Sequence, residues 1–286
     1  MAEITPQKVK ELREKTGAGM GDCKKALVDA EGDMQQAIEI LRKKGAASAA
    51  KRAERAANEG LIIAKTSNDG TKAIIVEVNC ETDFVARNEE FDKYVNTVAD
   101  TLLANDIKTI DELMKTSVDG DTIEGMHNEI LAKFSENIQI RRFDVVETEG
   151  HVAEYIHAGN KLAVVVEIDQ QGITEDASSM LRDIAMQIAA MNPQFIHREN
   201  VDDTTLRKEM EIYRQQAIDS GKKEEIADRI AQGRLDKFYQ ENCLVEQQFV
   251  KDPKKTVSDV LKEIGKEVGK DVKVKSFKRF FLGEVD

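Results

Sequence analysis

The spacing of apolar residues begins with a helical period. Within residues 1–45, Val9 and Leu12 form the apolar stripe of one short helix, and Ile38 and Leu41 form that of another. A further short helix is expected between them. Three such helices bury only a marginal core, so we expect residues 1–45 to form a small three-helix domain.

Capping residues predict where these helices begin and end. Thr5 followed by Pro6 is typical of a helix start, and Gly17 is expected to end that helix. Asp22 is expected to begin the second helix, and Gly45 to follow the third. These signals place three short helices before residue 46.

Residues 46–59 interrupt the apolar pattern. They are rich in alanine and charged residues and contain no large apolar side chain. Alanine favours helix, but this segment has no face to bury. We therefore expect a helical or partly frayed linker between the three-helix domain and the rest of the chain.

The apolar period changes to that of β-strands at Gly60. Residues 61–65 and 73–78 predict a hairpin around the Asn-Asp-Gly turn at residues 68–70. We assign residues 60–149 to the first half of a core domain. The helix predicted after the hairpin has one apolar face, which consists of Phe91, Tyr94, Val95, Val98 and Leu102.

The same layout returns 90 residues later. Residues 151–168 predict a second strand pair, and helical periodicity resumes after it. Gly60 and Gly150 are 90 residues apart, and so are Glu77 and Glu167. These matched positions suggest that a strand–strand–helix unit is duplicated. A coincidence between two unrelated α+β segments is the alternative.

The remaining residues are expected to complete a second half of the core. Residues 150–198 form its first part, and residues 239–286 complete it with a helix over 257–268 and a closing strand over 272–282. Between them, residues 199–238 are highly charged with apolar residues at spacings of four and three, which predicts an antiparallel coiled-coil hairpin. Its seam is narrow, so the hairpin is expected to protrude or to pair with a partner, and weak self-association is one form of pairing. The predicted fold class is α+β.

Composition and charge exclude several classes of function. The chain has 286 residues, of which 41% are hydrophobic and 34% charged, and its formal net charge is −12. This acidity argues against direct nucleic-acid binding and against an anionic membrane surface. Three cysteines without a CxxC motif predict reduced thiols and a cytoplasmic protein. No apolar run approaches the length of a membrane span.

Motifs for covalent or metal chemistry are not found in the sequence. Residues 17–22 read GAGMGD, but they follow a predicted helix and lack the Gly-Lys-Ser/Thr ending of a phosphate loop. His151 and His157 lie on one face of a strand, too far apart to share a metal ion. There is no GxSxG motif. We therefore expect a protein that is not an enzyme and needs no metal or cofactor.

A strand-to-helix corner offers the most informative feature. Residues 74–91 read IIVEVNCETDFVARNEEF, so a buried strand breaks at Cys80 and an acidic helix follows. In one interpretation, Thr82 or Asp83 caps the helix and Phe84 packs inward as a hydrophobic staple. In the other, Phe84 points outward toward a partner. Local physics favours the inward arrangement.

The same corner resembles a known family. NCETDFVARNEEF, together with the N-terminal run ITPQKVKELREKTGAGMGDCKKALVDAEGDMQQAIEILRKKG, is similar to bacterial elongation factor Ts proteins. The resemblance continues through ENIQIRR (residues 136–142), YIHAG (155–159) and KTVSDVLKE (255–263). It implies a ubiquitin-associated-like three-helix domain, a core of two related α+β halves, an inserted coiled-coil hairpin, and guanine-nucleotide exchange on elongation factor Tu.

The resemblance also implies roles for particular residues. The segment Thr82-Asp83-Phe84-Val85 would contact elongation factor Tu, with Phe84 wedged between helices of its nucleotide-binding domain so that the Mg²⁺ and phosphate site is disturbed. The partner interface would also include Arg13, Met20 and His157. An adaptor that binds peptides or helices through residues 1–45 is the alternative function.

The chain departs from the family pattern at three places. Met20-Gly21 stands where the best-studied bacterial members have two methionines, and Phe134-Ser135 replaces an Ile-Gly pair. The C-terminal helical module of some members is expected to be absent. Binding is therefore expected to rely more on the core.

Overall fold

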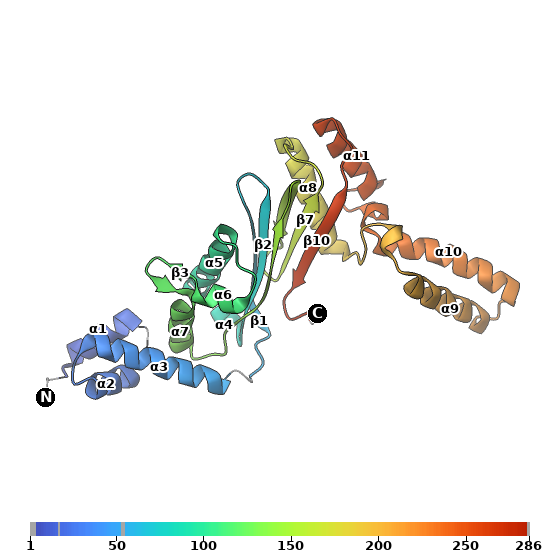
Figure 1. Ribbon diagram of the computed structural model, residues 1–286. Coiled ribbons are helices and arrows are strands. Elements are labelled where there is room, and N and C mark those ends of the chain that lie inside the picture. The colour runs from blue at the N-terminus through green and yellow to red at the C-terminus, as the bar shows by residue number, and fades with distance from the viewer. Residues whose placement is uncertain (1–3, 17, 53–54, 285–286) are drawn as a thin grey trace.

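The computed structural model describes residues 4–16, 18–52 and 55–284. Its centre consists of two three-stranded antiparallel sheets that pack face to face, with helices on the outer face of each sheet (Figure 1). Three N-terminal helices extend from one side of this centre and a two-helix hairpin from the other. The fold class is α+β.

The first half of the core, called the N-half, carries one sheet in the order β1-β2-β5. Its helices α5, α6 and α7 bury apolar residues against the outer face of that sheet. The elements of the N-half are β1 (Glu59–Thr66), β2 (Lys72–Cys80), α4 (Asp83–Ala86), α5 (Glu89–Ala104), α6 (Ile110–Lys115), β3 (Ser117–Val118), β4 (Asp121–Thr122), α7 (Ile123–Phe134) and β5 (Gln139–Glu147).

The second half, called the C-half, carries the other sheet in the order β10-β7-β6, covered by α8 and α11. Its elements are β6 (His151–Ile156), β7 (Leu162–Ile168), α8 (Glu175–Met191), η1 (Arg198–Asn200), η2 (Leu244–Glu246), β8 (Gln248–Phe249), β9 (Asp252–Thr256), α11 (Val257–Val268) and β10 (Val274–Phe281). The helices α9 (Asp203–Asp219) and α10 (Glu224–Asn242) interrupt this half.

The two halves match at an offset of 90 residues where their strand hairpins lie. A side chain added at Gly60 would meet the carbonyl oxygen of Val78 at 2.2 Å, and one added at Gly150 would meet that of Ile168 at 1.9 Å. Both glycines are therefore required by the same close approach of two strands.

The third strand of each sheet carries a bulge at the matched position. The β2–β5 register shifts beside Glu77, and the β7–β10 register shifts beside Glu167. Both carboxylates are buried and pair with a cation from the bulged strand, Glu77 with Arg142 at 2.8 Å and Glu167 with Lys275 at 2.9 Å. The extra residue of each bulge is a cation, Arg141 in β5 and Lys275 in β10, and each lies beside a carboxylate that has left solvent, with Arg141 Nη1 3.8 Å from Glu77 Oε1.

In the later part of each half, equivalent positions of the N-half and the C-half are 134 residues apart. Thr122 caps α7 and Thr256 caps α11, each accepting a backbone hydrogen bond. The helices then end at Ser135 and Gly269, both in the left-handed conformation. The difference of 44 residues between the two offsets corresponds to the segment that contains α9 and α10, so the hairpin is an insertion into a repeated layout.

A separate apolar layer joins the two sheets. Ile62 and Ile75 from the N-half pack with Val152, Val165 and Phe280 from the C-half, and all five are buried. Each residue faces away from the helices of its own half, as the alternation of side chains along a strand requires. The two sheets therefore form one body with helices outside.

The N-terminal helices are α1 (Pro6–Thr16), α2 (Met20–Asp29) and α3 (Met34–Arg52). The prediction that Asp22 begins the second helix is wrong by two residues, since the helix begins at Met20, with Gly19 as its N-cap. The expected end at Gly45 is also wrong, because α3 continues into the alanine-rich segment, whose propensity offsets the cost of one glycine of about 1 kcal/mol. The predicted end at Gly17 lies outside the described residues.

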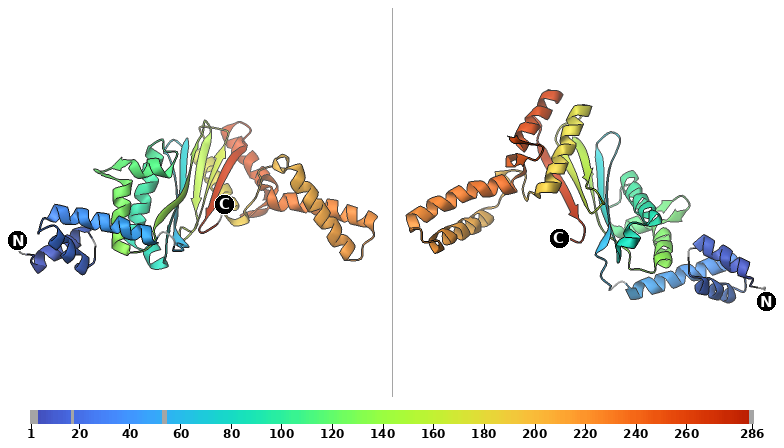
Figure 2. Two further views of the ribbon diagram at one scale, coloured as in Figure 1. Left: turned by 60° about the horizontal axis from the view of Figure 1, so that its bottom comes forward. Right: turned by 180° about the vertical axis from the view of Figure 1, so that it is seen from behind.

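Helix α3 also packs on the core. It lies against α7, where Arg42 donates to Asp121 at 3.0 Å and pairs with Glu129. The N-terminal helices lie on the same side of the N-half as α4 (Figures 1 and 2).

The inserted helices α9 and α10 pack side by side and project away from the sheets (Figure 2). Ala217, Ala227, Ala231 and Leu235 are buried between them, so the seam is built largely from small residues. Helix α10 ends at Asn242, four residues beyond the expected boundary. Among the described residues, no helix has the length and apolarity that crossing a bilayer requires.

Candidate functional site

The candidate site is the Phe84 turn, residues 81–88, which connects β2 to α5. Thr82 has an extended backbone and its Oγ1 accepts a hydrogen bond from the backbone N–H of Val85 at 3.4 Å, so it is the N-cap of α4. Asn88 caps α5 in the same way, through Glu90 N at 2.9 Å. Two caps in succession make the chain form one short helix and then a new one.

Phe84 points outward. Its side chain is 84% exposed, whereas the next most exposed large apolar side chain in the described part of the chain, that of Val28, is 53% exposed. The inward-packed arrangement that local physics favours is therefore wrong. Val85 and Ala86 fill the adjacent core instead, and the single turn of α4 leaves Phe84 on its opposite face.

A carboxylate from a distant part of the chain holds the start of the turn. Glu136 accepts hydrogen bonds from the backbone N–H groups of Glu81 and Thr82, each at 3.1 Å, and from Thr82 Oγ1 at 2.7 Å. In return, Glu81 Oε1 accepts from the backbone N–H of Asn137 at 2.6 Å. We call these four hydrogen bonds the Glu136 clamp. The sequence motif ENIQIRR contains Glu136, but no periodic signal connects it to Thr82.

The groups on either side of Phe84 differ in what they can do. Asp83, which precedes Phe84, forms an ion pair with Arg87 at 3.0 Å on the protein surface. Burial, followed by the negative charge of Glu136, raises the pKa of the Cys80 thiol to about 12. Cys80 is therefore a protonated thiol at neutral pH, and its Sγ donates to the carbonyl oxygen of Thr82 at 3.2 Å.

The turn that carries His157 lies at the same end of the two sheets as the Phe84 turn. Glu59 pairs with Cys80 across β1 and β2, and its carboxylate accepts from Lys161 Nζ at 2.7 Å. The backbone of Ile62 also donates to Asn160 at 2.7 Å. His157 is exposed in this second turn, and its Nδ1 lies 3.0 Å from the hydroxyl of Tyr155.

The other predicted interface residues lie on the N-terminal helices. Arg13 is exposed on α1, and Met20 is exposed at the first position of α2. The helices α1 and α2 pack against each other and against α3. The structure therefore brings the turns of Phe84 and His157 to one end of the core, and leaves Arg13 and Met20 on a separate group of helices.

The histidines outside the His157 turn differ in their surroundings. His127 is buried, and its Nδ1 lies 2.7 Å from the hydroxyl of Tyr94. His151 is half-buried, and that burial lowers its pKa. Within the residues that the structure describes, no three His, Cys, Asp or Glu side chains gather at metal-binding distance.

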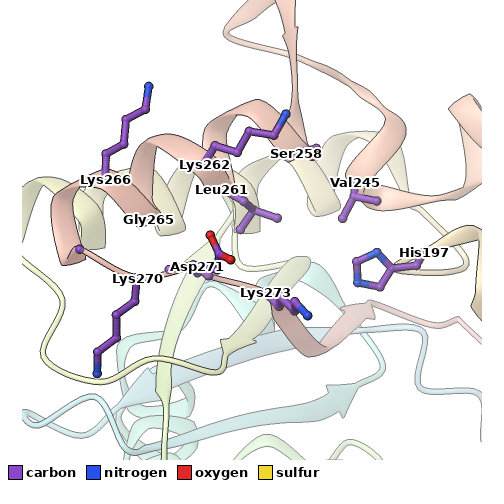
Figure 3. A pocket seen from close by; sticks show the side chains of 12 residues that line it. His197, Val245, Ser258, Leu261, Lys262, Gly265, Lys266, Lys270, Asp271 and Lys273 are labelled. Atoms are coloured by element: carbon purple, nitrogen blue, oxygen red, sulfur yellow. The ribbon is translucent and has the colours of Figure 1, made fainter.

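A cavity of about 820 Å³ lies beside α11 (Figure 3), at the end of the core opposite to α4 (Figure 1). Four lysines, Lys262, Lys266, Lys270 and Lys273, stand around an apolar floor that includes Leu261 and Val272. Lys262 donates to Asp259 at 3.0 Å. This cavity contains no residue of the Phe84 turn.

Comparison with known proteins places the chain in a family. A family model described as "Elongation factor TS" matches residues 81–284, which include the Phe84 turn and the inserted hairpin. The match spans most of the α+β core and all of its inserted helices, so it places the chain in a class of translation factors. Curated relatives agree over nearly the whole chain.

Three relatives illustrate that agreement. Elongation factor Ts of Clostridium perfringens (strain SM101 / Type A) is 46% identical over 283 residues, covering 98% of this chain and 93% of the relative. That of Clostridioides difficile (strain 630) is 46% identical over 99% and 94% of the two chains. That of Chloroherpeton thalassium is 45% identical over 99% and 100%. The chain belongs to the elongation factor Ts family, and it is a translation elongation factor.

Proposed function

We propose that this protein is the guanine-nucleotide exchange factor of elongation factor Tu. It binds the GDP form of that GTPase and promotes release of GDP and its exchange for GTP. The observation that carries the proposal is Phe84, a large apolar side chain that is 84% exposed on a turn whose backbone is held by the Glu136 clamp. An apolar side chain kept in solvent on a held turn is suited to insertion between elements of a partner.

The proposed mechanism is mechanical and involves no covalent step. Phe84 wedges between helices of the partner's nucleotide-binding domain, with Thr82, Asp83 and Val85 shaping the turn behind it. The wedge displaces the elements that hold Mg²⁺ and the phosphates. The protein itself then needs no metal or cofactor and is not an enzyme.

The free energy gained by burying a single phenylalanine is too small to account for exchange, so the interface has to include further contacts. An acceleration of about ten-thousandfold requires the release barrier to fall by about 5.5 kcal/mol. Burying one phenylalanine contributes about 1.5–3 kcal/mol. The rest has to come from further contacts, and Arg13, Met20 and His157 are exposed and available to supply them.

The same energetics make the complex transient. If this protein weakens the binding of GDP by a given factor, GDP weakens the binding of this protein by the same factor. Nucleotide therefore displaces the factor once exchange is complete. This behaviour is expected of a catalyst of exchange in the cytoplasm.

Finer assignments of the domains belong to the same proposal. Residues 1–45 act as a ubiquitin-associated-like domain that docks on the partner's nucleotide-binding domain, and residues 46–59 connect it to the core halves. The hairpin at 199–238 is a coiled coil that contacts a partner or a second copy of the chain only weakly. The buried alanines of its seam support close packing of the two helices.

A mixing experiment tests the proposed function. Elongation factor Tu loaded with a fluorescent GDP is mixed with this protein, and release is followed by stopped flow. We expect faster release and, on gel filtration, a nucleotide-free complex that excess GDP dissolves. Unchanged release, or a complex that withstands millimolar GDP, would contradict the proposal.

A further inference from the structure

We infer that Glu136 is a positioning residue that holds the Phe84 turn in its projecting conformation; this inference rests on the proposed exchange function. Three hydrogen bonds converge on one carboxylate, from Glu81 N, Thr82 N and Thr82 Oγ1, at 2.7–3.1 Å. A carboxylate has two acceptor oxygens with several lone pairs, so a single side chain of this length can hold both peptide groups and the hydroxyl at once.

The clamp is reciprocal, which makes it stiff. Glu136 holds residues 81 and 82, while the carboxylate of Glu81 holds the backbone N–H of Asn137 at 2.6 Å. Asn137 is buried, and its side-chain amide donates to the carbonyl of Arg55 at 2.7 Å. Three chain segments that are distant in sequence therefore meet at the base of the Phe84 turn.

Phe84 depends on this support because its own side chain has little to pack against. Helix α4 is a single turn of four residues, and such a turn has little stability of its own. Val85 and Ala86 fix one side of the turn by burial, and the clamp fixes the other. Without the clamp, the turn would have to become ordered while Phe84 inserts into the partner. The entropy cost of that ordering would raise the barrier to GDP release.

Glu136 could instead act through its charge, by touching the partner directly. Two conservative variants separate the alternatives. Glu136→Asp keeps the charge but shortens the side chain by one methylene, so its oxygens no longer reach both peptide groups. Glu136→Gln keeps the reach and an acceptor oxygen for the two N–H groups but removes the charge. Glu267→Gln, on an exposed part of α11, is the control for loss of charge.

The experiment measures GDP release from elongation factor Tu at saturating concentrations of each full-length variant. We expect Glu136→Asp to lower the maximal rate about tenfold, with the half-saturating concentration changed less than about twofold. Glu136→Gln is expected to stay within about threefold of the wild type, and Glu267→Gln to equal it. In a protein that already carries Phe84→Ala, adding Glu136→Asp is expected to lower the GDP release rate by no more than about twofold, because no wedge remains to be positioned.

A second measurement uses the free protein and does not depend on exchange. Amide hydrogen exchange at Glu81 and Thr82 is expected to be at least about tenfold faster in Glu136→Asp than in the wild type, with the thermal unfolding midpoint recorded alongside. Three results would each overturn the inference. The Asp and Gln variants could lose nucleotide-exchange activity equally, or Glu136→Asp could still lower the GDP release rate about tenfold in the Phe84→Ala background. The third is an unchanged rate of amide hydrogen exchange in Glu136→Asp. If the wild-type protein does not accelerate GDP release from elongation factor Tu, the proposed function is wrong. Amide hydrogen exchange at Glu81 and Thr82 still decides whether the Glu136 clamp holds the turn.

Discussion

The two halves of the core differ in the segment that follows their central strand. In the N-half, β2 leads into the Phe84 turn and α4 before α5 begins. In the C-half, β7 leads to α8 without such a helix, and Thr174, the residue 90 positions after Phe84, is the N-cap of α8. A half can therefore be built without a projecting turn. Val85 and Ala86 of the added helix join the core of the N-half, whereas the exposed Phe84 adds little to its packing.

The connections to the third strand differ in the same way. Glu136 clamps the Phe84 turn in the N-half, whereas the residue 134 positions later, Lys270, lines a cavity (Figure 3). In the C-half, Asp169 is instead joined to Lys273, whose backbone N–H donates to Asp169 Oδ1 at 2.9 Å. One scaffold thus carries a projection at one end and a lysine-lined hollow at the other.

The helical layers of the halves differ in polarity. Tyr94 and His127 form a buried pair in the N-half, and the matched positions of the C-half hold Ile184 and Leu261. Burial lowers the pKa of His127 to about 4 from its usual 6.5. Between these values the unfolded chain binds the proton and the folded chain does not, so stability falls as the pH drops.

The largest expected effect on stability is therefore a pH dependence that belongs to the N-half. Lowering the pH from 7 to 5 is expected to reduce the free energy of unfolding by about 2 kcal/mol through His127. Urea denaturation at the two pH values measures it. Replacing the pair by its C-half counterpart, Tyr94→Ile with His127→Leu, is expected to remove most of that difference. An equal fall in the double variant would show that His127 is not the responsible group.

A smaller effect is expected where the two halves end their matched helices. Ser135 ends α7 with φ 57°, and Gly269 ends α11 with φ 70°. Since a Cβ costs energy in this left-handed conformation, Ser135→Gly is expected to stabilise the protein by about 1 kcal/mol. Gly269→Ser is expected to destabilise it by a similar amount, because its Cβ would meet no atom within 4 Å and only backbone strain remains. Two changes of the same sign in thermal or urea unfolding would contradict this account.

The sequence predicts the scaffold well because its signals are local. Apolar spacing and turn residues locate the strand pairs, the inserted hairpin and most helices, and the glycines at 60 and 150 mark the same close strand approach. The helix boundary at Gly45 fails because a run of alanines outweighs one glycine.

The conformation of the Phe84 turn is harder to predict from the sequence. The hydrophobic-staple signature favours an inward Phe84, whereas the family resemblance implies an outward one. In the structure Phe84 is exposed, and Val85 and Ala86 fill the adjacent core. The Glu136 clamp joins residues more than 50 positions apart through hydrogen bonds from one side chain to the backbone. Contacts of that kind leave no periodic trace, so they become visible only in the structure.

The central claim is that Phe84 makes the largest single contribution to exchange, while further contacts of the protein supply the rest of the energy. The most direct test is stopped-flow release of fluorescent GDP from elongation factor Tu by Phe84→Ala, with Phe281→Ala as a control at another exposed phenylalanine and Thr174→Ala as a control at the matched position. We predict a fall of at least about tenfold for Phe84→Ala, corresponding to the loss of about 1.5–3 kcal/mol of apolar burial. Both control variants are predicted to accelerate GDP release from elongation factor Tu as much as the wild type does. Thr174→Ala is expected to do so although the loss of its helix cap costs about 1 kcal/mol of stability. Equal release by Phe84→Ala and the wild type would contradict the account.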